Sequence, residues 1–469
     1  MNIRRSGTIV TISTLLNAVI SFMGIIILSN ITKQGELGTF FLFQAVLGIS
    51  SIPAAAGVNG AIEKRISQGE QGSVVLTTAV IIKSLLLIII AAALIIAKQQ
   101  INAYIGAEVT ILLIICMILR EGGHIVFRTM RGEKRVAMAS ILQMLQVVSW
   151  TFGGILLSFF GFGALGLVYS LLTSYFFMIS AGLVSLQIEF GQFSTDTAKS
   201  IYQYAKYNAV TSVSGTIYVW MDTVILGLFV GNNLIAAYEI AWRVSKIGLV
   251  VSRSVSMTTF PQLSEWADEG KSDKISEIVS ESLTPALIIV VPAFFGVTII
   301  GSDILGLLYG SAYVVATTAF VTLSLERIIK SITQVITRCL HAMDYPHLSA
   351  RASVLAVAAN IILNFLLIPR LNILGAAIAT AVSFGFKFLV EVYYLNNLIN
   401  ITLPTRDILA ISASSIIMSI FILVVNNYLG LENEIYLLCV IITSAILYFI
   451  SVLTFSSIRE KMSGVIDAL

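Results

Sequence analysis

Long apolar segments alternate with short polar connections along almost the whole chain of 469 residues. A helix that spans a bilayer needs about 20 predominantly apolar residues, and fourteen segments meet this requirement. They lie at 7–29, 37–60, 73–97, 106–127, 138–160, 162–186, 207–230, 233–260, 281–301, 314–340, 352–369, 373–397, 408–430 and 435–456. They are too long and too uniformly apolar for barrel strands, which alternate over about 10 residues. The pattern predicts an all-α polytopic membrane protein.

The composition agrees with this prediction and excludes several classes of protein. Hydrophobic residues make up 57% of the chain and charged residues only 11%, against about 25% charged residues in an ordinary soluble domain. A soluble enzyme could not cover its surface with so few charges. The net charge of +3 and the lack of polar tracts also argue against a disordered or a nucleic-acid-binding protein.

The distribution of Lys and Arg predicts the orientation, because cytoplasmic loops are enriched in both. With the N-terminus in the cytoplasm and 7–29 retained as the first helix, 18 of the 28 basic residues fall inside and three outside. An even number of spans also places the C-terminus in the cytoplasm. The remaining seven lie within predicted spans: Lys83, Arg243, Lys246, Arg253, Arg327, Lys330 and Lys387.

A weak internal repeat divides the chain. The segment that begins at Arg128 matches the one that begins at Arg338, at a spacing of about 210 residues, and 24–40 matches 222–238 at about 198. Six spans separate the copies, so both copies face the same way, as in transporters with parallel repeats. Chance similarity between apolar segments is the alternative. We predict six-helix halves at 1–206 and 207–400, followed by two further helices and a cytoplasmic tail at 401–469.

Basic residues line one side of three predicted helices. On a regular helix each set spans about 80° of arc. The sets are Glu239, Arg243, Lys246 and Arg253; Arg327, Lys330, Gln334 and Arg338; and Arg120, His124, Arg128 and Arg131. Charges within lipid are costly, so such residues face protein or a watery cavity. The excess of cations indicates an anionic ligand such as phosphate.

Other interpretations of these charges stay open. Arg128, Arg131, Arg338 and Arg253 could extend to the cytoplasmic headgroups. Ion pairs between Glu239 and Arg243, or Glu326 and Lys330, could be purely structural. Asp222 is a lone carboxylate in its span, which makes it a candidate for coupling to H⁺ or Na⁺ or a partner for a buried cation.

Several further residues lead to less specific expectations. Tyr218, Trp220, Tyr238 and Trp242 could stack against sugars, although core packing is the more common role of such side chains. Pro285 and Pro292 predict a bend in the ninth span. Cys116, Cys339 and Cys439 are expected to be small buried hydrophobes rather than disulfide partners. No cofactor and no metal site are expected.

Three short motifs carry a resemblance to a known family. They are Pro261–Glu265, Leu307–Tyr313, and the run Ala356–Pro369 with its continuation Leu374–Thr380. With fourteen spans, a repeat and a basic interior, the chain resembles the polysaccharide transporters of the multidrug/oligosaccharidyl-lipid/polysaccharide exporter superfamily, whose best-known members are the Wzx-type O-antigen flippases. The resemblance covers nearly the whole chain, and the order of the three motifs is more specific than any one of them.

The resemblance implies a flippase that moves a lipid-linked oligosaccharide from the cytoplasmic to the outer leaflet. Its substrate would be a sugar on a polyprenyl or dolichyl phosphate or pyrophosphate. The family's cationic cavity would correspond here to Arg243, Lys246, Arg327 and Lys330, and we add Arg253 and Arg120 as substrate-binding candidates. We expect partners among membrane lipids and glycan polymerases or glycosyltransferases, no nucleic acid, a monomeric state and a prokaryotic source.

Two relatives and one unrelated class remain as alternatives. An ion-coupled multidrug or cation antiporter of the same fold should line its pocket with carboxylates, and a lipid II flippase would share the basic interior. A membrane enzyme of glycan assembly should carry a large external loop and catalytic groups, which the sequence lacks. Its most polar inside loop, at 261–280, predicts only a short amphipathic surface helix.

Overall fold

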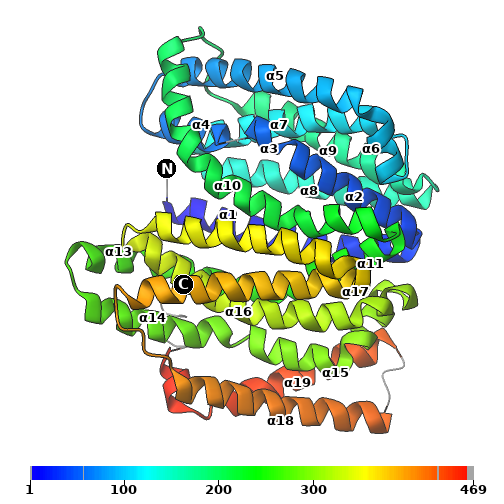
Figure 1. Ribbon diagram of the computed structural model, residues 1–469, viewed down its shortest axis with the longest axis vertical. Helices are drawn as coiled ribbons and strands as arrows, with labels where there is room; N and C mark the ends of the chain where they lie inside the picture. Colours follow the sequence, from blue (N-terminus) through cyan, green and yellow to red (C-terminus); the bar gives the residue numbers. More distant parts are fainter. Residues whose placement is uncertain (1–2, 56, 430–432, 462–469) are drawn as a thin grey trace. The chain divides into compact units, whose positions relative to one another are not determined.

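The structure is a computed structural model that describes residues 3–55, 57–429 and 433–461. Within these ranges, the side chains of residues 3–6, 207–212, 257–258, 261 and 429 are not described. The predicted inside residues Arg4 and Arg5, Pro261 of the first family motif, and the predicted tail at 462–469 therefore lie outside the described side chains. The described chain is helical with short connections (Figure 1), as the apolar pattern predicts.

The chain divides into two compact units, Met1–Ala236 and Ala237–Leu469. In unit 1 the long helices run roughly parallel (Figure 1). Their bounds are α1 (Ile3–Ile31), α2 (Gln34–Ser50), α3 (Ile52–Ala55), α4 (Val58–Ser67), α5 (Gly72–Ile96), α6 (Lys98–Ile105), α7 (Thr110–Gly132), α8 (Val136–Phe159), α9 (Gly163–Ser185) and α10 (Thr195–Phe229). The predicted boundary between the two six-helix halves, at 206/207, was derived from the repeat, whereas the units are defined by their compactness. The predicted boundary therefore stays a prediction.

Unit 2 begins within α11 (Asn232–Ser245). It continues with η1 (Lys246–Gly248), α12 (Leu249–Thr258), α13 (Phe260–Asp268), α14 (Ser272–Leu287), α15 (Val290–Tyr309), η2 (Ser311–Ala316), α16 (Thr317–Ala342), α17 (Pro346–Asn396), α18 (Thr405–Leu429) and α19 (Glu434–Val452). The predicted bend of the ninth span is the break between α14 and α15. The loop at 261–280 forms α13 and the start of α14 rather than one surface helix.

The structure gives a smaller number of candidate spans than the sequence predicts. Every one of the fourteen predicted segments overlaps a helix. By length and composition, ten helical segments of the described chain could cross a membrane, or eleven if α2 and the helices after it count as one bent span. The chain is therefore a multi-pass membrane protein, and the count of fourteen stays a prediction.

The internal repeat is visible in the burial of α7 and α16. Residues 121–132 and 331–342 show the same sequence of buried and partly buried positions, residue for residue, at a spacing of 210. Each helix is followed by a non-glycine residue with positive φ, Lys134 (61°) and Asp344 (64°), which is uncommon. Chance similarity between apolar segments would not reproduce these local geometries, so we attribute them to a structural repeat.

Two other connections repeat in the same way. The last residue of α1 lies 198 residues before the last residue of α10. The first residue of α2 likewise lies 198 residues before the first residue of α11. The turn between α8 and α9 corresponds to a break at Asn372 (φ 50°, ψ −130°) inside α17. This break separates the two spans predicted at 352–369 and 373–397. A Cβ at Gly375 would lie 2.5 Å from the carbonyl oxygen of Leu367, so the hairpin needs glycine there.

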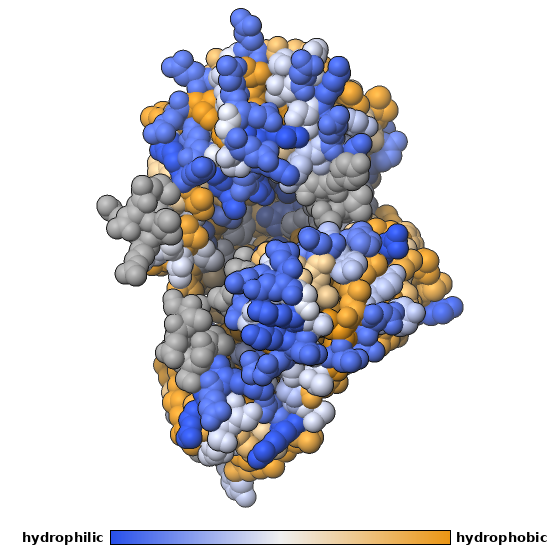
Figure 2. All heavy atoms as spheres, turned by 90° about the vertical axis from the view of Figure 1, so that its left-hand side faces the viewer, coloured by the Kyte–Doolittle hydropathy of each residue, from blue (hydrophilic) through white to orange (hydrophobic). Residues whose placement is uncertain are grey.

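The outer helices expose large apolar side chains. Leu85, Ile88 and Ile89 on α5 are each about 60% exposed or more, and Cys439 on α19 is exposed too, against the prediction that all three cysteines are buried. Such surfaces suit lipid rather than water. Hydrophilic residues instead gather at the helix ends, on the face that carries α13 and the start of α14 (Figure 2).

A buried ion pair connects α5 and α7 inside unit 1. The Lys83 ammonium lies 2.5 Å from Glu121 Oε2 and donates a hydrogen bond to Asn59 Oδ1 at 2.7 Å. Lys83 is 0% exposed and Glu121 1%. In this interior neither charge has access to water, so each depends on the other.

We expect Lys83→Met to destabilise the protein by about 3–5 kcal/mol, because it leaves the Glu121 carboxylate buried and unpaired. The melting temperature of the purified protein in detergent should fall by roughly 5 °C or more. Lys98→Met, which removes an exposed lysine of α6, serves as the control. Equal melting temperatures for both variants would contradict a stabilising role for this pair.

Candidate functional site

The predicted helix at 233–260 is interrupted where its basic residues lie. Helix α11 ends at Ser245, the 3₁₀ turn η1 follows, and α12 begins at Leu249. A 3₁₀ turn advances by about 120° per residue instead of 100°. The predicted span is therefore not one continuous helix: Arg243 and Lys246 lie before or at the break, and Arg253 lies beyond it. Three residues of 3₁₀ turn rotate the following helix by only about 60°, so the predicted common side of these residues stays a prediction.

Two cations lie beside the ring of Trp242 in unit 2. The Lys246 ammonium lies 3.0 Å from the centroid of the indole ring, and the Arg327 guanidinium carbon lies 5.9 Å from it. Arg243 Nη2 lies 3.1 Å from Glu239 Oε2, which confirms the ion pair predicted between these residues from their spacing of four on a helix. Trp242 is 8% exposed, so its ring packs in the core and contacts a cation.

Arg327 is fixed by groups on two helices. Its Nη1 lies 2.6 Å from Glu326 Oε2, and its Nε donates to Ser245 Oγ at 3.1 Å. Arg327 and Glu326 are 2% and 0% exposed. The predicted pair of Glu326 with Lys330 does not form; Glu326 is bonded to its neighbour in sequence. These contacts favour a positioning role for Arg327 over direct contact with substrate.

Arg253 and Lys330 come together in a second place in the same unit. They line a cavity of about 330 Å³ between α12, α16 and α17, which we call the basic pocket. Its other lining residues are Ser256, Thr333, Gln334, Thr337, Arg338, His341, Phe384 and Lys387. The Lys330 ammonium lies 4.4 Å from the centroid of the Phe384 ring.

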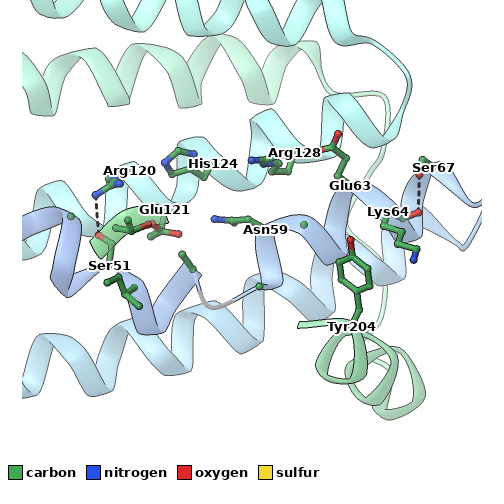
Figure 3. Close-up of a pocket in the computed structure, with 16 residues that line it drawn as sticks. Ser51, Asn59, Glu63, Lys64, Ser67, Arg120, Glu121, His124, Arg128 and Tyr204 are labelled. Atoms are coloured by element: carbon green, nitrogen blue, oxygen red, sulfur yellow. Dashed lines mark hydrogen bonds and ion pairs between the residues drawn. The ribbon is translucent and has the colours of Figure 1, made fainter. Parts of the chain in front are cut away.

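Arg120 belongs to unit 1 and lines a different cavity, of about 770 Å³, which we call the mixed-charge pocket. Arg120, His124 and Arg128 follow one face of α7, and Asn59 and Glu63 lie opposite on α4 (Figure 3). Lys64 points away from α7, with its ammonium 4.6 Å from the centroid of the Tyr204 ring. Arg120 Nη1 donates weakly to Leu47 O (3.3 Å) and Ser51 Oγ (3.4 Å).

Asp222 lies in the apolar part of α10, as predicted. It is 5% exposed and interacts with other groups of the structure, so it is not an isolated charge. A coupling role and a structural role both remain compatible with this position.

Sequence reasoning missed how the basic pocket is completed. Lys387 and Phe384 come from the second half of α17, more than 50 residues after Lys330. Helical periodicity relates residues on one helix only. The signal that could have found them is Lys387 itself, an unexplained lysine inside a predicted span.

Known proteins similar to this chain share its family and its fold. The family described as "Polysaccharide biosynthesis protein" matches residues 27–318. Two proteins of Haloferax volcanii match nearly end to end. The "probable low-salt glycan biosynthesis flippase Agl15" is 35% identical, and the match covers 98% of each chain. The "probable flippase AglR" is 29% identical, and the match covers 96% of each chain.

Solved structures with low sequence identity share the fold. The lipid II flippase MurJ in an inward closed conformation superposes with a TM-score of 0.81 at 16% identity, over 95% of this chain and 98% of that one. An inward-facing transporter of the multidrug resistance MATE family gives a TM-score of 0.62 at 18% identity, over 81% and 95%. At these identities the likeness concerns the fold alone.

We expect Arg327→Met to lower the stability of the protein by about 3–5 kcal/mol, because Glu326 has no other ionic partner among the described residues. Arg253→Gln should leave stability nearly unchanged, because Arg253 is exposed. Thermal unfolding of both purified variants in detergent measures the difference. A stable Arg327→Met protein together with an unstable Arg253→Gln protein would contradict the stabilising role of Arg327.

Proposed function

The chain belongs to the polysaccharide biosynthesis protein family, and from this premise we propose that it is a flippase for a lipid-linked glycan. The substrate is an oligosaccharide on a polyprenyl or dolichyl phosphate or diphosphate, moved from the cytoplasmic to the outer leaflet for the assembly of surface polysaccharide or glycoprotein glycans. The end-to-end match to a relative named as a glycan biosynthesis flippase carries this proposal.

The buried cations support an anionic substrate. A phosphate–sugar headgroup cannot cross hydrocarbon without a polar path, because its charge would lose its hydration. Lys246 and Arg243 offer positive charge near Trp242, and Arg253, Lys330 and Arg120 line cavities. Lysine and arginine stabilise phosphate as the headgroup passes, while the lipid tail can stay in the bilayer. Arg327 holds Ser245 and Glu326 in place beside them.

Alternating access is the mechanism that fits this fold. Transporters with parallel repeats expose a site to one side of the membrane and then to the other by moving one half against the other. MATE transporters of this fold are known in inward-facing and outward-facing conformations. We place both termini in the cytoplasm on the basis of the Lys and Arg bias.

The alternatives are less well supported. A pocket for cationic drugs needs carboxylates, whereas Arg253, Lys330, Arg338 and Lys387 bring four cations into one cavity. The likeness to the lipid II flippase concerns the fold alone at 16% identity, while the relative at 35% identity is named for glycan biosynthesis.

We expect Lys246→Met to reduce flipping at least tenfold, because an ionic contact to phosphate contributes about 1.5–3 kcal/mol. The assay is proteoliposomes with a head-labelled prenyl diphosphate sugar, in which flipping is the fraction that an impermeant quencher reaches. Lys246→Arg should retain most activity. Lys271→Met, at an exposed lysine of unit 2, controls for loss of charge, and normal flipping by folded Lys246→Met would contradict the role of Lys246.

We further propose that Asp222 couples transport to H⁺ or Na⁺. Asp222→Asn should then lower flipping driven by an imposed ion gradient several-fold and leave gradient-independent exchange unchanged. Asp196→Asn is the matched control, because Asp196 lies on the same helix in its exposed first turn. Gradient-driven transport that is equal in both variants would move coupling to another residue.

A further inference from the structure

The ninth predicted span breaks at the point where it changes its packing partners. Helix α14 ends at Leu287 and α15 begins at Val290. Before the break, the buried apolar side chains of α14 pack against α13, α16 and the end of α17. From Leu287 onward they pack in a cluster with side chains of α18 and α19, which lie beside α15 in Figure 1. The last two helices are thus packed against the ninth span at and beyond its break.

Pro292 leaves one carbonyl of the break without its usual donor. In a regular helix the carbonyl oxygen of Ile288 accepts a hydrogen bond from the amide of residue 292. Proline has no amide hydrogen, so this bond cannot form. The next bond along the chain does form, from the Ala293 amide to the Ile289 carbonyl at 3.1 Å. Ile288 is 1% exposed, and a buried carbonyl needs a hydrogen-bond donor.

A side chain of α19 supplies that donor. The Tyr448 hydroxyl donates a hydrogen bond to the Ile288 carbonyl oxygen at 2.8 Å. Tyr448 is itself 1% exposed, and its ring lies in the same apolar cluster as Ile288. The ring therefore fills the core, while the hydroxyl completes the backbone of another helix.

Two further hydrogen bonds hold the end of α14. Ser331 Oγ on α16 donates to the Ala286 carbonyl at 2.6 Å. Thr284 Oγ1 donates to Asp407 Oδ2, in the first turn of α18, at 2.8 Å. Asp407 also accepts a hydrogen bond at 2.7 Å from Lys461, which follows α19. The α18–α19 pair is thus bonded to the ninth span at the break and about one turn before it.

These contacts are those of a supported hinge. A helix that lacks a backbone hydrogen bond bends there more easily than a continuous helix, and hinges are commonly a few residues at the ends of elements. A hydroxyl from a neighbouring helix satisfies the carbonyl without restoring the bond within the helix. The break therefore keeps its freedom to bend, and the neighbouring helix determines how it is held.

We propose that α18 and α19 form a brace for this hinge, with Tyr448 as its positioning residue, and that the ninth span bends at the hinge during transport. The brace follows from the contacts of unit 2 alone. Its part in transport rests on the proposed function, because alternating access requires helices to move against one another.

Tyr448→Phe tests the brace, because it removes the hydroxyl and keeps the ring. Amide hydrogen exchange over residues 286–296 of the purified full-length protein, measured by mass spectrometry, should become about tenfold faster. Tyr436→Phe is the matched control, because Tyr436 lies on the same helix and is 54% exposed. It should exchange like the wild type. Equal exchange in the wild type and both variants overturns the brace.

Pro292→Ala tests whether the hydroxyl serves the carbonyl that proline leaves without a donor. It restores an amide at residue 292, so the backbone itself can donate to Ile288. In this background Tyr448→Phe should change exchange by at most about twofold. A tenfold effect of Tyr448→Phe in both backgrounds would show that the hydroxyl acts elsewhere, and it would overturn the role of Tyr448 at the break.

The proteoliposome assay tests the part in transport. Pro292→Ala should slow flipping because the span stiffens, and Tyr448→Phe because the bend is no longer held, each by about threefold or more. The double variant should flip no more slowly than Pro292→Ala alone. Wild-type flipping by variants with altered exchange overturns the role in transport and leaves the brace. Lack of flipping by the wild-type protein overturns the proposed function, whereas the exchange measurements still decide the brace.

Discussion

Charge within a bilayer must be balanced locally, because neither water nor salt can screen it there. The described interior follows this constraint closely. Lys83 has Glu121, Arg243 has Glu239, and Arg327 has Glu326. These contacts join neighbouring helices or hold a side chain against its own helix, so the positions of the charges and the packing of the helices depend on one another. A cation without a carboxylate partner relies on neutral groups of the chain, as Arg120 does on Leu47 O and Ser51 Oγ.

The repeat shows how one fold can give its halves different chemistry. Helices α7 and α16 share their pattern of burial and the positive-φ turn that follows each. The backbone positions have been kept while the charges facing them have changed. In unit 1 Arg128 pairs with Glu63 and Glu121 pairs with Lys83, whereas in unit 2 Arg338 lies beside the ring of Phe260 and Ser331 donates to the carbonyl of Ala286. Equivalent positions of the two helices therefore have different neighbours.

Periodicity and charge predicted some contacts and failed for others for physical reasons. The pair of Glu239 with Arg243 was predictable, because residues four apart on a helix are neighbours. The place of Arg253 was not, because the cavity that it lines is completed by residues of α16 and α17. Glu326 pairs with Arg327 rather than Lys330, and Arg327 also donates a hydrogen bond to Ser245 on another helix, a contact that helical spacing does not predict. The partner of Lys83, 38 residues away, carries no local signal at all.

The sequence by itself determined that the chain lies in a membrane and that it is helical, and it predicted the orientation. Runs of about 20 apolar residues can satisfy their backbone in lipid only as helices, and the distribution of Lys and Arg predicts which helix ends are cytoplasmic. It also contained the repeat, as similar segments at spacings of about 198 and 210 residues. Only the tertiary structure decided which cations share a cavity and which have an acid. That depends on contacts between helices such as α12, α16 and α17, which are distant in the chain and whose relative rotation is set by side-chain packing.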